Sequence, residues 1–144
     1  TGTWVSVGPL RARFLDHFAP YVRDVVFAAA DKDDIAALIF PDIEACRKLG
    51  GFAADASPAA IIDAAAVRRK FAELLGSLAA LNPGSSMRVE RAILMAEPPS
   101  MDKGEMTDKG SINQRAVLKN RAALVDELYA LPLSSRVIAV EGKH

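Results

Sequence analysis

A lysine stands beside a glycine in residues 107–115, where the sequence reads Thr-Asp-Lys-Gly-Ser-Ile-Asn-Gln-Arg. Gly110 tolerates backbone angles that other residues resist, and Ser111 and Gln114 have the spacing of a capping box at a helix start. Lys109 would then project from a loop that is fixed to a helix N-terminus. An ammonium there suits a phosphate, a carboxylate or a developing oxyanion, because the free N–H groups of the helix also favour negative charge. Thr-Asp-Lys-Gly is also an ordinary solvated turn, so the spacing leaves both interpretations open.

Other groupings of chemically active residues are weaker. The three aspartates of segment 31–34 lack the glycine and the distal glutamate of a calcium loop, so a hairpin turn is the better interpretation. Cys46 is the single cysteine, and His17 and His144 are the two histidines, which excludes an intrachain disulfide and a Cys/His metal cluster. We assign no metal. No glycine-rich loop runs into Lys-Ser or Lys-Thr, so the domain alone is not expected to bind a nucleotide.

Composition indicates one soluble domain. The chain has 144 residues, of which 51% are hydrophobic, enough for a single core. Its 18 basic and 18 acidic residues cancel, which gives no electrostatic footprint for nucleic acid or an anionic membrane. No apolar run is long enough to span a bilayer, and no cleavable leader opens the chain. We expect a cytoplasmic protein, to which the lone cysteine is suited.

Hydrophobic periodicity predicts an α+β domain with a short antiparallel hairpin or three-stranded sheet and about three to five helices. The predicted strands are 22–30, 35–40 and 88–95, and a turn joins the first two. Helices are expected after Pro9, Asp42, Ser57 and the lysine loop. Their buried residues are predicted to be Leu10, Phe14 and Phe18 in the first helix, Val67, Phe71, Leu74, Leu78 and Leu81 in the third, and Leu118, Ala122, Val125 and Tyr129 in the last.

Two segments keep two interpretations each. Ala53 to Ala66 is rich in alanine, and its apolar content predicts a packed helix or an inserted loop rather than a disordered linker. Residues 137–140 can add an edge strand, or Pro132 to His144 can form a loose tail. Cys46 lies among apolar residues of a predicted helix, where it is interpreted as a small buried hydrophobe.

Residues 108–118, Asp-Lys-Gly-Ser-Ile-Asn-Gln-Arg-Ala-Val-Leu, and residues 2–8, Gly-Thr-Trp-Val-Ser-Val-Gly, resemble the C-terminal domain of the feruloyl-CoA synthases. That family belongs to the adenylate-forming superfamily, with the acyl-CoA synthetases, luciferases and peptide-synthetase adenylation domains. The resemblance covers essentially the whole chain. It implies that residues 1–144 are one C-terminal domain, that Thr1 to Gly8 form a loop next to a hinge, and that a large N-terminal domain precedes them.

This resemblance implies a two-step ligase reaction. A hydroxycinnamate-type acid is first joined to ATP, with Mg²⁺, and pyrophosphate is released. The acyl group then passes to coenzyme A. The small domain swings over the large one between the two steps, so the partners are its own N-terminal domain and a small aromatic carboxylic acid. The fragment alone is expected to be inactive and to bind neither ATP nor coenzyme A.

The resemblance also implies roles for individual residues. Lys109 is the candidate catalytic lysine of adenylation, and Gly2, Thr3 and Trp4 are candidates for the loop that lines the pantetheine path. Gly110, Ser111 and Gln114 support the lysine motif. Trp4 can equally be a residue of the domain core.

Two positions depart from the superfamily pattern. Many relatives read Gly-Lys-Ile, whereas here Ser111 follows the glycine and the lysine precedes it. Lys109 is still the best candidate, and Lys103 is the fallback on the same loop. Arg11 stands where many relatives carry a glutamate. The alternative to a ligase is a non-catalytic α+β binding module that docks a partner through apolar faces.

Overall fold

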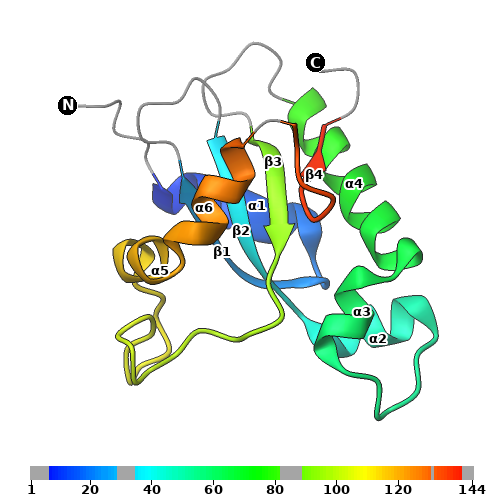
Figure 1. Cartoon of the computed structure of the whole chain (residues 1–144), viewed down its shortest axis with the longest axis horizontal. Coiled ribbons are helices and arrows are strands. Elements are labelled where there is room, and N and C mark those ends of the chain that lie inside the picture. The colour runs from blue at the N-terminus through cyan, green and yellow to red at the C-terminus, as the bar shows by residue number, and fades with distance from the viewer. Residues whose placement is uncertain (1–6, 29–34, 82–88, 131, 141–144) are drawn as a thin grey trace.

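The computed structural model describes residues 7–28, 35–81, 89–130 and 132–140. Four strands form one sheet in the order β1-β2-β3-β4, and the described residues contain six helices around it (Figure 1). The predicted α+β class is confirmed. The strands are β1 (Val22–Ala28), β2 (Ile35–Pro41), β3 (Val89–Leu94) and β4 (Ile138–Ala139). The helices are α1 (Val7–Phe18), α2 (Ile43–Gly50), α3 (Pro58–Asp63), α4 (Ala65–Ala80), α5 (Gln114–Asn120) and α6 (Ala122–Tyr129).

The sheet is mixed because its strands are joined in two different ways. β1 and β2 pair antiparallel, as the predicted hairpin requires, and residues 29–34, where the turn was predicted, lie outside the described residues. β2 and β3 pair parallel, since the chain returns through α2, α3 and α4 before it enters β3. β4 pairs antiparallel with β3 through Ala139 opposite Arg91 and Ile138 opposite Ala92, which confirms the edge strand within 137–140.

Helices cover both faces of the sheet, and the strand sequences follow from this. Alternate residues of β1 belong to different cores: Val25 and Phe27 pack with the α1 and α4 side, and Val26 packs with the α5 and α6 side. Every residue of β2 is buried, as expected for an inner strand with two covered faces. Figure 1 shows α6 in front of the sheet and α1 behind it.

The predicted helix starts after Asp42 and Ser57 are confirmed together with their caps, whereas the first helix begins at Val7, two residues before the predicted start at Pro9. Leu10, Phe14 and Phe18 are buried along one side of α1, where the rings of Phe14 and Phe18 stack 4.1 Å apart. Asp42 caps α2 by accepting a hydrogen bond from the Ala45 N–H at 3.0 Å. Ser57 caps α3 in the same way through the Ala60 N–H.

The two longest predicted helices are each broken once. Ala64 has an extended backbone, with ψ at 140°, and separates α3 from α4. The prediction was wrong at two positions of the stripe: Leu75 is fully buried while Leu74 is only half-buried against the core, and Leu81, just past the end of α4, is 67% exposed. Arg121 separates α5 from α6. In the described residues, no helix is both long and apolar enough to cross a membrane.

Candidate functional site

Lys109 lies at the tip of a tight hairpin formed by residues 106–112, which we call the lysine hairpin. The Gly110 N–H donates to the Thr107 carbonyl at 2.9 Å, and the Thr107 N–H donates to the Ser111 carbonyl at 2.8 Å. The two ends are joined by an antiparallel bridge. Gly110 has a φ of +86°, a left-handed backbone angle that glycine adopts without steric cost. The order Lys-Gly therefore has a geometric reason.

The Lys109 side chain is exposed and makes no hydrogen bond or ion pair among the described residues. An ammonium in this state is available to an anion that approaches the hairpin tip. Lys103 is also exposed, but it lies on a separate turn, where its N–H donates to Ser100 Oγ at 3.2 Å. The candidate and its fallback thus belong to different turns of the same loop.

The predicted capping box of Ser111 and Gln114 is wrong. The cap of α5 is Asn113, whose Oδ1 accepts the Ala116 N–H at 3.0 Å. Ser111 instead closes the hairpin, and its N–H donates to Thr107 Oγ1 at 3.1 Å. Asparagine and serine are equally good N-cap residues, so the sequence offers two candidate caps for α5, Ser111 and Asn113.

Gln114 connects the lysine motif to the sheet. Its Nε2 donates to the Val25 carbonyl at 2.9 Å, and its Oε1 accepts the Phe27 N–H at 3.2 Å. One carboxamide therefore bonds backbone groups of two β1 residues that are two positions apart. The start of α5 and the hairpin that precedes it are held at a fixed place on β1.

A buried ion pair lies at the base of the lysine hairpin. Glu105 is only 1% exposed, and its carboxylate accepts two hydrogen bonds from the Arg121 guanidinium, from Nε at 3.0 Å and from Nη2 at 2.9 Å. This bidentate geometry fixes both orientation and distance. Glu105 Oε1 also accepts the Ser100 N–H at 2.9 Å, and the Asn113 N–H donates to the Glu105 carbonyl at 2.8 Å. Glu105 thus joins the loop, the hairpin and the start of α5.

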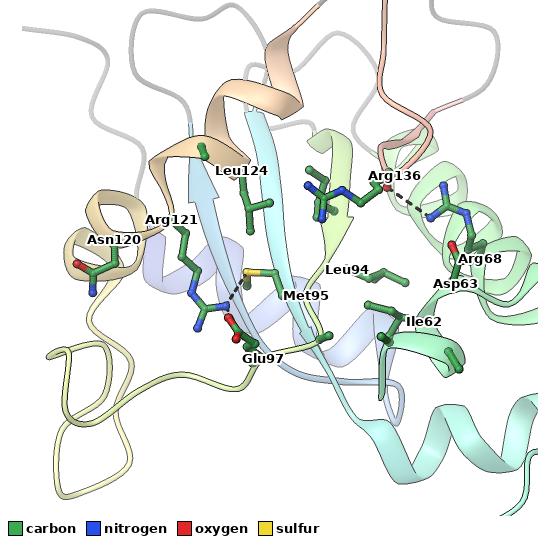
Figure 2. Close-up of a pocket in the computed structure, with 15 residues that line it drawn as sticks. Ile62, Asp63, Arg68, Leu94, Met95, Glu97, Asn120, Arg121, Leu124 and Arg136 are labelled. Carbon is green, nitrogen blue, oxygen red and sulfur yellow. Dashed lines mark hydrogen bonds between the residues drawn. The ribbon is translucent and has the colours of Figure 1, made fainter. Parts of the chain in front are cut away.

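All five N–H donors of Arg121 have acceptors. Besides the carboxylate, the guanidinium donates to the Glu97 carbonyl at 3.1 Å, to the Pro98 carbonyl at 3.0 Å and to the Met95 sulfur at 3.3 Å. Figure 2 shows the Arg121 side chain reaching Met95 and lying beside Glu97. The guanidinium also lies over the Phe40 ring, 5.1 Å from its centre. Arg121 therefore fastens the loop of residues 95–105 to the start of α6.

Electrostatics agree with this geometry. The guanidinium of Arg121, and after it the Ser100 N–H, hold the pKa of the Glu105 carboxyl below its ordinary value, although burial alone would raise it. The carboxylate is therefore charged at neutral pH. This pair was not predicted from the sequence, because two charged residues 16 positions apart, one in a loop and one between two helices, carry no local signal.

Two clefts open beside the site. One, of about 760 Å³, lies between α3, α4 and α6 and includes Arg121 and Leu124 in its wall (Figure 2). The other, of about 670 Å³, borders the lysine hairpin at Gly110 and Ile112 and the loop at Pro98. We assign no ligand to either cleft.

Of the other residues singled out in the sequence, some lie in the described part of the chain and some lie outside it. Cys46 is fully buried, and burial raises the pKa of its thiol to about 11, which confirms the interpretation as a small core residue. Arg11 makes a bidentate ion pair with Asp24, from Nε at 2.7 Å and from Nη2 at 2.9 Å. Gly2, Thr3 and Trp4, and the aspartates of segment 31–34, lie outside the described residues. The described residues contain no cluster of metal-ligating side chains.

No protein-family model matches the sequence, and no curated protein matches it either. Solved structures do match. The A domain of carboxylic acid reductase from Segniliparus rugosus, in complex with AMP and a co-purified carboxylic acid, has a TM-score of 0.63 and 21% identity over 89% of this chain and 18% of that chain. The A-PCP didomain of carboxylic acid reductase from Segniliparus rugosus, in complex with AMP, has a TM-score of 0.57 and 20% identity over 82% of this chain and 15% of that chain.

A third structure, the adenylation domain of a carboxylate reductase from Mycobacterium chelonae, has a TM-score of 0.59 and 17% identity over 87% of this chain and 18% of that chain. Each match covers most of this chain and less than a fifth of the other. The chain therefore shares the fold of one part of these adenylation domains. At these identities the likeness concerns the fold alone.

Proposed function

We propose that this chain is the C-terminal domain of an adenylate-forming enzyme, which closes over a large N-terminal domain that binds ATP and a carboxylic acid. The observation that carries the proposal is an unpaired lysine at the tip of an ordered hairpin, in a fold shared with adenylation domains. Two of these structures are complexes with AMP, the nucleotide product of such a reaction. ATP, with Mg²⁺, is accordingly the proposed nucleotide of the full protein.

The proposed first step is the transfer of an adenylyl group. A carboxylate oxygen of the acid attacks the α-phosphorus of ATP, the bond from that phosphorus to the pyrophosphate oxygen breaks, and an acyl-adenylate and pyrophosphate result. During this step, negative charge is redistributed among the oxygens of the α-phosphate and of the leaving pyrophosphate. An ammonium about 4 Å from such an oxygen is worth roughly 4 kcal/mol at an effective dielectric near 20. If Lys109 makes this contact only in the transition state, the full interaction energy lowers the activation barrier.

The proposed second step is transfer of the acyl group to coenzyme A. The thiol sulfur of coenzyme A attacks the acyl carbon, AMP leaves, and the thiol proton passes to solvent. A hydroxycinnamate such as ferulate is the proposed acid, and this finer assignment is supported by the sequence motifs alone. The acid pocket would belong to the large domain.

The experiment that tests the function is pyrophosphate release. We expect the longer protein that contains this chain to release pyrophosphate from ATP when ferulate and Mg²⁺ are present, and the 144-residue chain alone to release none. If the longer protein releases no pyrophosphate with any of a panel of aromatic and aliphatic acids, the binding-module alternative is favoured. Pyrophosphate release by the isolated chain would contradict the assignment of the nucleotide site to another domain.

The hinge-proximal loop gives a separate prediction. If Gly2 and Trp4 line the path of the pantetheine arm, Gly2→Val and Trp4→Ala in the longer protein should slow acyl transfer to coenzyme A and leave adenylate formation nearly unchanged. The two half-reactions are measured separately, by pyrophosphate release and by thioester formation from presynthesised acyl-adenylate. An equal loss in both steps, together with a lower melting temperature, would assign Trp4 to the core instead.

A further inference from the structure

The position of Lys109 depends on how the lysine hairpin is attached to the rest of the domain. The hairpin itself is held by a few backbone hydrogen bonds and is mostly exposed. On its C-terminal side, Gln114 is bonded to β1. On its N-terminal side, Glu105 is bonded to Arg121. The two attachments meet where the Asn113 N–H donates to the Glu105 carbonyl.

Arg121 reaches this point because of the break between α5 and α6. Its backbone angles, φ −113° and ψ 35°, are not those of a regular helix, and its side chain lies against the loop of residues 95–105. Asn120 adds a hydrogen bond from Nδ2 to the Lys103 carbonyl at 3.0 Å. The junction of two short helices therefore holds the whole loop that leads into the lysine hairpin.

A buried ion pair contributes little net stability, because removing two charges from water offsets most of their attraction. A bidentate pair nevertheless defines geometry sharply, since both the angle and the distance of the two groups are fixed. In a reaction that needs an ammonium at one place, a displacement of about 1 Å can lower the rate by roughly a hundredfold. The pair is thus better suited to holding the hairpin than to stabilising the domain.

We propose that Glu105 and Arg121 are positioning residues for Lys109, which fix the base of the lysine hairpin so that the ammonium reaches the reacting phosphate. This proposal rests on the proposed function of Lys109. It assigns no contact with substrate to either residue. Arg121→Lys is the central variant, because it keeps the charge and removes the planar fork.

In the longer protein, Arg121→Lys should lower kcat of adenylation by roughly tenfold or more, with KM values for ATP and the acid within about twofold of the parent. Thioester formation from presynthesised acyl-adenylate should stay close to the parent rate. Arg136→Lys is the matched control: Arg136 makes a similar bidentate pair with Glu127, with Nε to Oε2 at 2.9 Å, away from the hairpin. This control should leave adenylation unchanged.

A double-variant comparison separates positioning from general destabilisation. If Arg121 acts through Lys109, adding Arg121→Lys to Lys109→Ala should lower adenylation no further than Lys109→Ala alone. Full additivity of the two losses would overturn the proposal. If Lys109→Ala itself leaves adenylation unchanged, the positioning proposal fails together with the role of Lys109. If Lys109→Ala lowers adenylation and Arg121→Lys does not, only the positioning proposal fails.

Hydrogen exchange gives a readout that does not depend on activity. In the longer protein, Arg121→Lys should make amides of peptide 106–113 exchange faster by about tenfold or more, while peptides from β1 to β3 keep their protection. Glu105→Gln, which preserves shape, should have the same effect if Arg121→Lys does not fold. Unchanged exchange of peptide 106–113 in a folded variant would show that the pair does not fix the hairpin.

Discussion

Replacing Lys109 by alanine is expected to lower the rate of acyl-adenylate formation by a factor of about a hundred or more, as the loss of one preorganised donor does elsewhere. The same variant, supplied with presynthesised acyl-adenylate and coenzyme A, should make thioester at close to the parent rate. The reason is that the ammonium is proposed to act in one step and to move away with the domain before the next. Pyrophosphate release and thioester formation measure the two steps in the longer protein.

Lys103→Ala is the matched control for this experiment. Both lysines are exposed, but Lys103 lies on the turn before Glu105 and Lys109 at the hairpin tip beyond it. Lys103→Ala should therefore leave both half-reactions nearly unchanged. If Lys103 proves to be the damaging position, or if Lys109→Ala has no effect on adenylation, the catalytic assignment is wrong even though the fold assignment stands.

Arg121→Ala should lower the free energy of unfolding of the domain by about 3 kcal/mol or more at pH 7, because it leaves a buried carboxylate without its partner. The loss should depend on pH. In the parent, the pKa of Glu105 is below its ordinary value, so its contribution is present at neutral pH and is lost only as the pH falls through that lowered pKa. In the variant, burial should raise the pKa of Glu105, so the variant should lose least stability at low pH, where the buried carboxyl is protonated and neutral.

The difference in stability between parent and Arg121→Ala should therefore shrink between pH 7 and about pH 4, which urea denaturation of the 144-residue chain can measure. Arg136→Ala is the control, since the Arg136 side chain is 60% exposed and its pair should contribute no more than about 1 kcal/mol. Replacing both Glu105 and Arg121 by leucine should recover part of the loss. A pH-independent loss, or a double variant worse than Arg121→Ala, would contradict this account.

Local patterns in the sequence predicted most of the fold because they report local chemistry. Leu10, Phe14 and Phe18 recur at helical spacing, and the apolar runs of β1 and β2 are separated by the polar residues 31–34. Asp42 and Ser57 stand immediately before their helices and cap them. The fourth strand was predicted as one of two alternatives, and pairing with β3 decided between them.

Features that depend on tertiary contacts could not be predicted in this way. The alanine-rich segment carries no signal for an extended residue at Ala64, so one long helix was expected where the structure has α3 and α4. Asn113 caps α5 because Ser111 is already bonded into the hairpin, a competition that spacing alone does not reveal. The Glu105–Arg121 pair forms only once the loop has folded back onto the junction of α5 and α6.

The amide of Gln114 has a consequence beyond the fixing of α5. β1 is an outer strand of the sheet, and outer strands offer free N–H and C=O groups to which a second chain can add itself. Gln114 occupies one such donor, on Phe27, and one such acceptor, on Val25. The residue that anchors the lysine motif thereby leaves two fewer edge groups to which a second chain can pair.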